Sequence, residues 1–152
     1  MTAANFLPPA IMLVDDEQPF VETMAKRLTK RDLIVSTALS GQEALDKLAA
    51  GGPSNVDVVI LDVKMPGMDG LETLAAIKVK HPNIEVIMLT GHATVESAIE
   101  GMKGGAFDYL MKPCDMDLLM SKVEQAVAKK RAHEAKILEA KVQMYALQKG
   151  LD

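Results

Sequence analysis

Five short apolar runs recur along the first three quarters of the chain, at residues 11–14, 33–37, 56–62, 84–89 and 106–111. They are rich in Val, Ile and Leu and end at Gly, Pro or charged residues, which is typical of strands. The run at 56–62 is apolar at successive positions, so it predicts a strand buried on both faces of a parallel sheet. The run at 33–37 is more polar and predicts an outer strand.

Helical patterns fill the gaps between these runs, with apolar residues three and four positions apart. Pro19 predicts the start of the first helix, with Gln18 as its cap. Residues 40–43, Ser-Gly-Gln-Glu, form a capping-box pattern for the second helix. Further helices are expected over residues 71–80, over 94–103 with Thr94 as the cap, and from residue 117 to about residue 149.

Strands that alternate with helices predict βαβ units, a parallel sheet and right-handed crossovers. The expected fold is therefore α/β, a small doubly wound sheet of five strands with an extended C-terminal helix. We expect a flexible leader over residues 1–9, one domain over 10–128, and a helical extension over 129–152 that forms a coiled coil or a linker.

Composition restricts the function only loosely. The chain has 152 residues, 49% of them hydrophobic, which is enough for one domain with a full core. A net charge of −4 and a pI near 5.4 argue against a general nucleic-acid or membrane surface. Cys114 is the single cysteine, so no disulfide forms within the chain and a reducing cytoplasm is the simplest setting. Residues 1–9 resemble neither a secretory signal nor a membrane anchor.

Polar side chains follow four of the predicted strands: Asp15 and Asp16, Asp62, Thr90, and Lys112. Parallel topology brings these strand ends to one edge of the sheet, where open α/β folds bind their ligands. Three carboxylates in one place repel one another unless a cation lies between them, and Lys112 alone does not neutralise three. Hard oxygen ligands without His or Cys suit Mg²⁺ better than zinc or copper.

Each of these residues also has a simpler interpretation. Asp62 could start a turn, which is the commoner role of an aspartate before a Pro/Gly-rich loop. Asp15 and Asp16 could cap the first helix, and Thr90 could cap a later one, although Thr94 is better placed. Lys112 could be an ordinary surface lysine. The agreement of all four strand ends favours a site.

Several motifs together resemble the receiver domain of two-component response regulators. The resemblance covers about residues 10–129, and it lies in Leu-Val-Asp-Asp-Glu at 13–17, Asp62 with Met-Pro-Gly-Met-Asp-Gly at 65–70, Leu-Thr-Gly at 89–91, Gly-Ala-Phe-Asp-Tyr-Leu at 105–110, and Lys-Pro at 112–113. It implies a flavodoxin-like sheet with strand order 2-1-3-4-5. Residues 105–115 are most like the receivers of nitrogen-regulation-type AAA+ transcription activators.

The resemblance implies that Asp62 accepts a phosphoryl group from a sensor histidine kinase or a phosphotransfer protein. Mg²⁺ would be held by Asp15, Asp16, Asp62 and the backbone carbonyl of Lys64, and Lys112 would contact the phosphoryl group. Such a protein is a signalling phosphoacceptor that catalyses only its own phosphorylation and dephosphorylation.

The switch residues implied by the resemblance are Thr90 and Tyr109. The Thr90 hydroxyl would bond the phosphoryl group, and Tyr109 would turn into the space that Thr90 leaves. The surface that changes would be that of the fourth helix, the fifth strand and the last helix. Lys64 and His92 would tune the lifetime of the phosphoryl group, and a cis peptide bond is expected between Lys112 and Pro113.

The C-terminal extension carries a pattern of its own. Residues alternate by four and three, as in a heptad seam, at Leu119, Val123, Ala126, Lys130, His133, Ile137, Ala140, Met144 and Leu147. The dimer seam would be Ile137, Ala140, Met144 and Leu147, giving a homodimer. The alternative is a single helix that extends into solvent. Residues 129–131, Lys-Lys-Arg, are interpreted as a solvated face.

Three other functions are alternatives to a free-standing receiver. The chain could be the N-terminal regulatory part of a sigma-54-type activator. An aspartyl-phosphate phosphatase of the haloacid-dehalogenase kind needs Asp-x-Asp after the first strand, and Asp62-Val63-Lys64 does not provide it. A flavodoxin-like flavin site needs a phosphate cradle where this chain has Asp15, Asp16 and Glu17.

Overall fold

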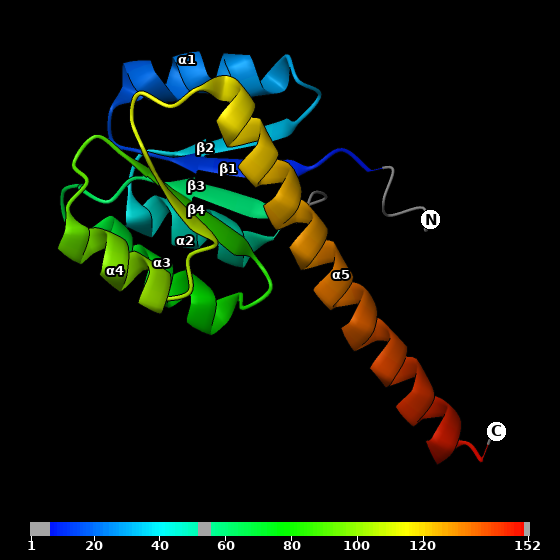
Figure 1. The fold of residues 1–152 in the computed structure, drawn as a ribbon. Helices are drawn as coiled ribbons and strands as arrows, with labels where there is room; N and C mark the ends of the chain where they lie inside the picture. The colour runs from blue at the N-terminus through cyan, green and yellow to red at the C-terminus, as the bar shows by residue number, and fades with distance from the viewer. Residues whose placement is uncertain (1–6, 52–55, 151–152) are drawn as a thin grey trace.

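The computed structural model describes residues 7–51 and 56–150 (Figure 1). Five parallel strands form one sheet in the order β2-β1-β3-β4-β5, which confirms the predicted topology. The strands are β1 (Ala10–Val14), β2 (Ile34–Ala38), β3 (Val58–Leu61), β4 (Glu85–Thr90) and β5 (Asp108–Met111). The predicted runs differ from these bounds by up to two residues.

Five helices connect and flank the strands of the described chain. They are α1 (Gln18–Thr29), α2 (Gly41–Ala50), α3 (Gly70–Lys80), α4 (Val95–Lys103) and α5 (Met116–Gln148). Ser40 and Thr94 cap α2 and α4 through their side chains, as predicted. The predicted cap of α1 is wrong, because Gln18 already lies in the helix and Glu17 is the N-cap, without a side-chain bond.

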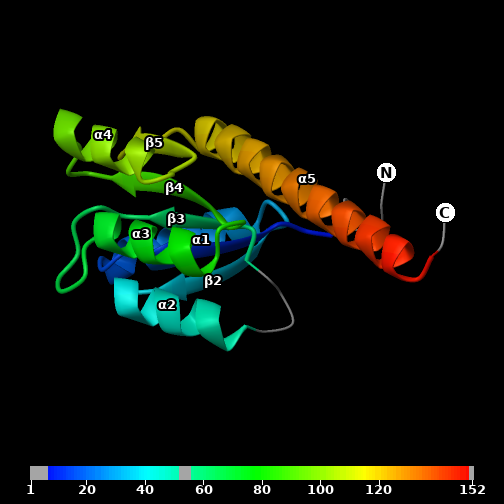
Figure 2. The same cartoon turned by 90° about the horizontal axis from the view of Figure 1, so that it is seen from below.

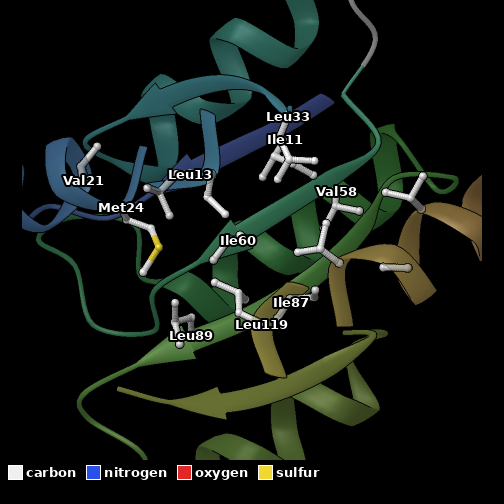
Figure 3. Close-up of a cluster of buried hydrophobic side chains, with 14 residues drawn as sticks. Ile11, Leu13, Val21, Met24, Leu33, Val58, Ile60, Ile87, Leu89 and Leu119 are labelled. Carbon is white, nitrogen blue, oxygen red and sulfur yellow. The ribbon is translucent and has the colours of Figure 1, made fainter. Parts of the chain in front are cut away.

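The two faces of the sheet are covered by different helices. Helices α1 and α5 pack on one face, and α2 and α3 pack on the other (Figures 1 and 2). Successive residues of a strand point to opposite faces, so Ile11 and Leu13 face α1 and α5 while Met12 and Val14 face α2 and α3. Figure 3 shows the cluster of buried side chains on the face covered by α1 and α5, which includes Ile60 from β3 and Leu119 from α5. The central strands are therefore buried on both sides, as their apolar sequences require.

Helix α5 is continuous through residue 148 and extends beyond the sheet (Figure 1). The first four positions of the predicted seam are buried against the domain, namely Leu119, Val123, Ala126 and Lys130. None of the helices in residues 7–51 and 56–150 combines the length and apolar character needed to cross a membrane.

The interpretation of residues 129–131 as a solvated face is wrong for Lys130, which is only 5% exposed. Its Nζ lies 2.9 Å from Oδ1 of Asp57 and 3.1 Å from Oε1 of Glu134. Arg131 also reaches Asp57, at 3.2 Å, and donates to the carbonyls of Leu7 and Pro8. The carboxylate beneath the helix explains why a lysine occupies a core-facing position.

The residues expected as a leader, 1–9, are described only from Leu7 onward. Gly-Gly-Pro at residues 51–53 predicts the end of the second helix, but residues 52–55 lie outside the described ranges, as do residues 151–152. Gly51 does end α2, with a positive φ of 67°.

Candidate functional site

Strands β1, β3, β4 and β5 place the predicted site residues at one edge of the sheet. Asp15 follows β1, Asp62 follows β3, Thr90 ends β4 and Lys112 follows β5. One carboxylate oxygen from each of Asp15, Asp16 and Asp62 lies within 4.8 Å of the other two. The sheet therefore gathers three carboxylates that are up to 47 positions apart in the sequence.

Asp15 and Asp62 are both buried, with 1% and 2% of their surfaces exposed, whereas Asp16 is exposed. Burial raises the pKa of the Asp62 carboxyl above its ordinary value, and the nearby Asp15 adds to the rise; bonding from Thr90, the charge of Lys112 and the Val63 amide act in the opposite direction. The Val63 N–H donates to Oδ1 of Asp62 at 2.9 Å. This carboxylate is held in place but is short of positive charge.

Among the described residues, Lys112 provides the cationic side chain that pairs with this cluster. Its Nζ lies 2.5 Å from Oδ2 of Asp15 and 4.0 Å from Oε1 of Glu17. The same Nζ lies 3.9 Å from the centroid of the Phe20 ring, which comes from the first turn of α1. The peptide bond between Lys112 and Pro113 is cis, as expected.

The loop after β3 is shaped to approach Asp62 closely. Gly70, the first residue of α3, donates its N–H to the Val63 carbonyl at 2.7 Å. A Cβ at Gly70 would overlap the carbonyl oxygen of Asp62, so the position requires glycine. Asp69 caps α3 by accepting the Glu72 N–H, which fixes the end of the loop.

Thr90 and Tyr109 lie on neighbouring strands, but each has its own partner. The Thr90 hydroxyl accepts the His92 N–H at 3.0 Å. The Tyr109 hydroxyl lies 2.6 Å from Oγ of Ser97, and Ser97 also completes the capping box of α4 with Thr94. Tyr109 is thus linked to the first turn of α4.

The remaining predicted residues lie at exposed or half-buried positions. Lys64 and His92 have exposed side chains on the loops that follow β3 and β4. Ile137 is half-buried, and Ala140, Met144 and Leu147 are exposed on α5.

Sequence reasoning missed the parts played by Phe20 and Ser97. Helical spacing from Phe20 to Val21, Met24 and Leu28 predicts only that Phe20 lies on the inner face of the first helix, and it does not indicate a contact with Lys112, which is far away in the sequence. Ser97 could have been found from its position three residues after Thr94, which is where a capping box takes its second partner.

The donor set suits a hard divalent cation. Asp15, Asp16 and Asp62 offer only carboxylate oxygens, and the described residues place one ammonium group, that of Lys112, against them. Burial and the nearby Asp15 disfavour the ionised form of Asp62, and a bound cation would stabilise that form. The residues therefore fit Mg²⁺.

Comparison with known proteins agrees with the fold. The family model described as response regulator receiver domain matches residues 11–124. The chain is 40% identical over 116 residues to the DNA-binding transcriptional regulator NtrC of Klebsiella pneumoniae, covering 76% of this chain and 24% of that protein. It is 34% identical over 137 residues to the transcriptional regulatory protein ZraR of Klebsiella oxytoca, covering 90% of this chain and 30% of that protein.

Among solved structures, the response regulator TrrA of Thermotoga maritima, in complex with Mg²⁺ and BeF, superposes with a TM-score of 0.70 and 34% identity. The match covers 78% of this chain and 98% of that one. The chain spans only about a quarter of the curated relatives. Fold, motifs and family match agree, and the chain belongs to the family of response regulator receiver domains.

Proposed function

We propose that this receiver accepts a phosphoryl group on Asp62 from a histidine kinase or a phosphotransfer protein, and that it does so with Mg²⁺. The observation that carries the proposal is the cluster of Asp15, Asp16 and Asp62, in which burial and the charge of Asp15 raise the pKa of the Asp62 carboxyl. The relative TrrA has been crystallised with Mg²⁺ and BeF, which supports the same chemistry.

Mg²⁺ would be held by Asp15, Asp16, Asp62 and the Lys64 carbonyl, and it would supply positive charge where phosphoryl oxygens gather. An oxygen of Asp62 forms a bond to phosphorus while the phosphorus–nitrogen bond of the donor phosphohistidine breaks. The imidazole leaves with the bonding electrons, and Asp62 becomes an acyl phosphate. Lys112 contributes its ammonium to a phosphoryl oxygen, so charge and alignment are the protein's main contributions.

The signal would pass through Thr90 and Tyr109. A phosphoryl oxygen would draw the Thr90 hydroxyl away from the His92 amide, and Tyr109 would move in response. The bond from Tyr109 to Ser97 links this movement to the N-terminus of α4. Exposed apolar side chains on α4, β5 and α5 supply a surface for a partner: Val95, Ile99, Met102, Met111 and Leu118. Lys64 and His92, on the loops beside the site, would set how long the acyl phosphate lasts.

We assign residues 10–128 to the receiver and residues 129–152 to an extension that links it to a partner. The extension would form a homodimer through Ile137, Ala140, Met144 and Leu147, which repeat at heptad spacing. The likeness to NtrC and ZraR supports a finer proposal, in which this receiver regulates a transcription-activating output domain. Such signalling would take place in the cytoplasm.

The test is to incubate the protein with Mg²⁺ and acetyl phosphate and to measure its intact mass and its sedimentation. Asp62→Asn should take up no phosphoryl group, because the amide is not a nucleophile of this kind. Asp46→Asn makes the same change on the exposed face of α2, and it should react like the wild type. Lys112→Ala should bind Mg²⁺ but fail to switch.

A phosphoryl adduct on wild type and on Asp46→Asn, but not on Asp62→Asn, supports the proposal. An adduct that persists in Asp62→Asn contradicts the assignment of the phosphoacceptor. A wild-type protein that binds Mg²⁺ but takes up no phosphoryl group would be a docking module rather than a phosphoacceptor. Steady turnover of a small phosphoester would instead favour a phosphatase.

A further inference from the structure

We propose that Phe20 is a positioning residue that holds the Lys112 ammonium ready for an incoming phosphoryl oxygen. This inference rests on the proposed function. Its starting point is the distance of 3.9 Å between Lys112 Nζ and the centroid of the Phe20 ring, which is a close cation–π contact. The Lys112 side chain is only 15% exposed, so the ring replaces part of the water that would surround this charge.

Two segments far apart in the sequence create the contact. Phe20 lies in the first turn of α1, where Pro19 fixes the start of the helix directly after the acidic residues 15–17. Lys112 comes from the end of β5. Phe20 also packs against the core cluster beneath α1 and α5, so the ring is held from below while its face meets the ammonium.

An aromatic ring suits this position because it does not compete with a phosphoryl oxygen for the Lys112 ammonium. Asp15 and the exposed Glu17 already lie 2.5 Å and 4.0 Å from Lys112 Nζ, and a further carboxylate in place of the ring would compete with a phosphoryl oxygen for the ammonium. Water would have to be displaced before the phosphoryl group could bind. A π face stabilises the ammonium without engaging it in a strong ion pair, and Lys112 has three N–H donors to share.

In the structure one of these donors reaches Oδ2 of Asp15 at 2.5 Å. Asp15 is also an expected ligand of Mg²⁺, so its hold on Lys112 would weaken when a cation is bound. The Phe20 ring would keep the ammonium at the sheet edge while its partner changes from Asp15 to a phosphoryl oxygen. The role of Phe20 is therefore to position Lys112, and Phe20 itself takes no part in bond formation.

The test compares Phe20→Leu, which keeps an apolar side chain but loses the π face, with Phe20→Tyr and Phe20→Trp, which keep an aromatic face. Formation of the acyl phosphate from acetyl phosphate should slow by about 3- to 10-fold in Phe20→Leu and stay within about 2-fold of wild type in the aromatic variants. In Lys112→Met, a further Phe20→Leu change should have no additional effect on this rate. Equal rates in Phe20→Leu and wild type would overturn the proposal.

Two measurements test the contact without any phosphoryl transfer. The CH₂ resonances of Lys112 should show a ring-current shift in wild type, Phe20→Tyr and Phe20→Trp that is lost in Phe20→Leu. A double-mutant cycle of Phe20→Leu and Lys112→Met in urea unfolding should give a coupling of about 2- to 30-fold in the folding equilibrium. Absence of both signals would disprove the contact, whereas their presence in a protein that takes up no phosphoryl group would place the failure in the proposed function.

Discussion

The central strand β3 has an aspartate at each end, and the two lie in opposite electrostatic settings. Asp57, before the strand, is 5% exposed and accepts from Lys130 at 2.9 Å, from Arg131 at 3.2 Å and from the Ala10 N–H at 2.9 Å. Asp62, after the strand, is similarly buried but lies beside Asp15 and Asp16. The same side chain is thus ion-paired with two cations at one edge of the sheet and part of a cluster of three carboxylates at the other.

The difference comes from helix α5. It starts after β5 and crosses the face of the sheet (Figure 1). At the edge where the strands begin, here called the amino edge, its residues Lys129, Lys130 and Arg131 contact the acidic residues before β3 and at the start of β4. Even Glu85, whose Oε2 accepts no hydrogen bond from the described residues, has Lys129 Nζ at 3.6 Å. At the carboxyl edge, Asp15, Asp16 and Asp62 come from the loops after β1 and β3, and Lys112 is the cation that the described residues place against them. Buried charge stabilises the fold only where its partners are built in.

Of the changes that test this comparison, substitution of Asp57 should have the largest effect on the free energy of unfolding. Asp57→Ala leaves the Lys130 ammonium and the Ala10 N–H buried without their carboxylate, so the free energy of unfolding should fall by about 3–5 kcal/mol. Urea unfolding monitored by circular dichroism measures the change. Asp46→Ala, on the exposed side of α2, should stay within about 0.5 kcal/mol of wild type.

A second change checks the cause of that loss. Adding Lys130→Met to Asp57→Ala removes the buried ammonium, which would then keep only the half-buried Glu134 as its partner, and should recover part of the stability. If the double variant is no more stable than Asp57→Ala, the ion pair is not what anchors α5.

The next effect is at the carboxyl edge, where the missing cation can be added. Mg²⁺ at about 100 times its dissociation constant should raise the free energy of unfolding by about 2.7 kcal/mol, or roughly 5–10 °C in melting temperature. Differential scanning calorimetry with and without Mg²⁺ measures this shift. It should persist in Phe20→Leu, which leaves the three carboxylates intact, and an equal shift in Asp62→Asn would contradict the role of Asp62 as a ligand.

Substitution of Asp62 should give the opposite sign from substitution of Asp57. Without Mg²⁺ at pH 7, Asp62→Asn should be more stable than wild type by about 0.5–2 kcal/mol, since it removes a charge that the site does not compensate. Asp57→Asn should be less stable than wild type. The pair of variants, compared in one urea series, separates a carboxylate whose charge lowers stability from one whose ion pairs raise it.

The pH dependence follows from the raised pKa of Asp62. In the folded protein the Asp62 carboxyl keeps its proton at pH values above its ordinary pKa of 3.8, where the same carboxyl in the unfolded chain has lost it. The free energy of unfolding of wild type should therefore decline as pH rises through the interval between the ordinary and the raised pKa. Asp62→Asn should lack this decline, and a wild-type curve parallel to that of Asp62→Asn would show that the Asp62 charge is tolerated.

The sequence predicted the carboxyl edge better than the amino edge, for a physical reason. Apolar runs that end in Asp15, Asp62 and Lys112 carry their own signal, because parallel topology alone brings strand ends together. Lys130 has the spacing of a core position, in phase with Leu119 and Val123, but the basic run at residues 129–131 indicated a solvated face. Whether a lysine is buried depends on the carboxylate beneath it, and that requires knowing where α5 crosses the sheet.

The same limit applies to Phe20. Its place on the inner face of α1 could be predicted from helical spacing, but its contact with Lys112 joins two segments that no local pattern connects. Element bounds were predictable to about two residues, because caps such as Ser40 and Thr94 mark them. Contacts between side chains of distant segments were not.

The smallest expected effect on stability lies beyond both edges, in the free part of α5. Ile137→Glu should change the free energy of unfolding of the domain by less than about 0.5 kcal/mol, because this turn lies past the contacts of Lys130 and Arg131. It should nevertheless shift sedimentation toward monomer if the seam of Ile137, Ala140, Met144 and Leu147 forms the dimer.

Leu138→Glu is the matched control, since neighbouring positions on a helix differ by about 100° in direction and Leu138 therefore faces away from that seam. It is 64% exposed and introduces the same charge one residue later. Loss of the dimer in Ile137→Glu alone supports the seam, and loss in Leu138→Glu alone moves the interface to the other side of the helix. If the wild-type protein sediments as a monomer at every concentration, the end of α5 is a single helix without a partner helix. Its attachment to the domain would then depend on the ion pairs of Lys130 and Arg131 with Asp57.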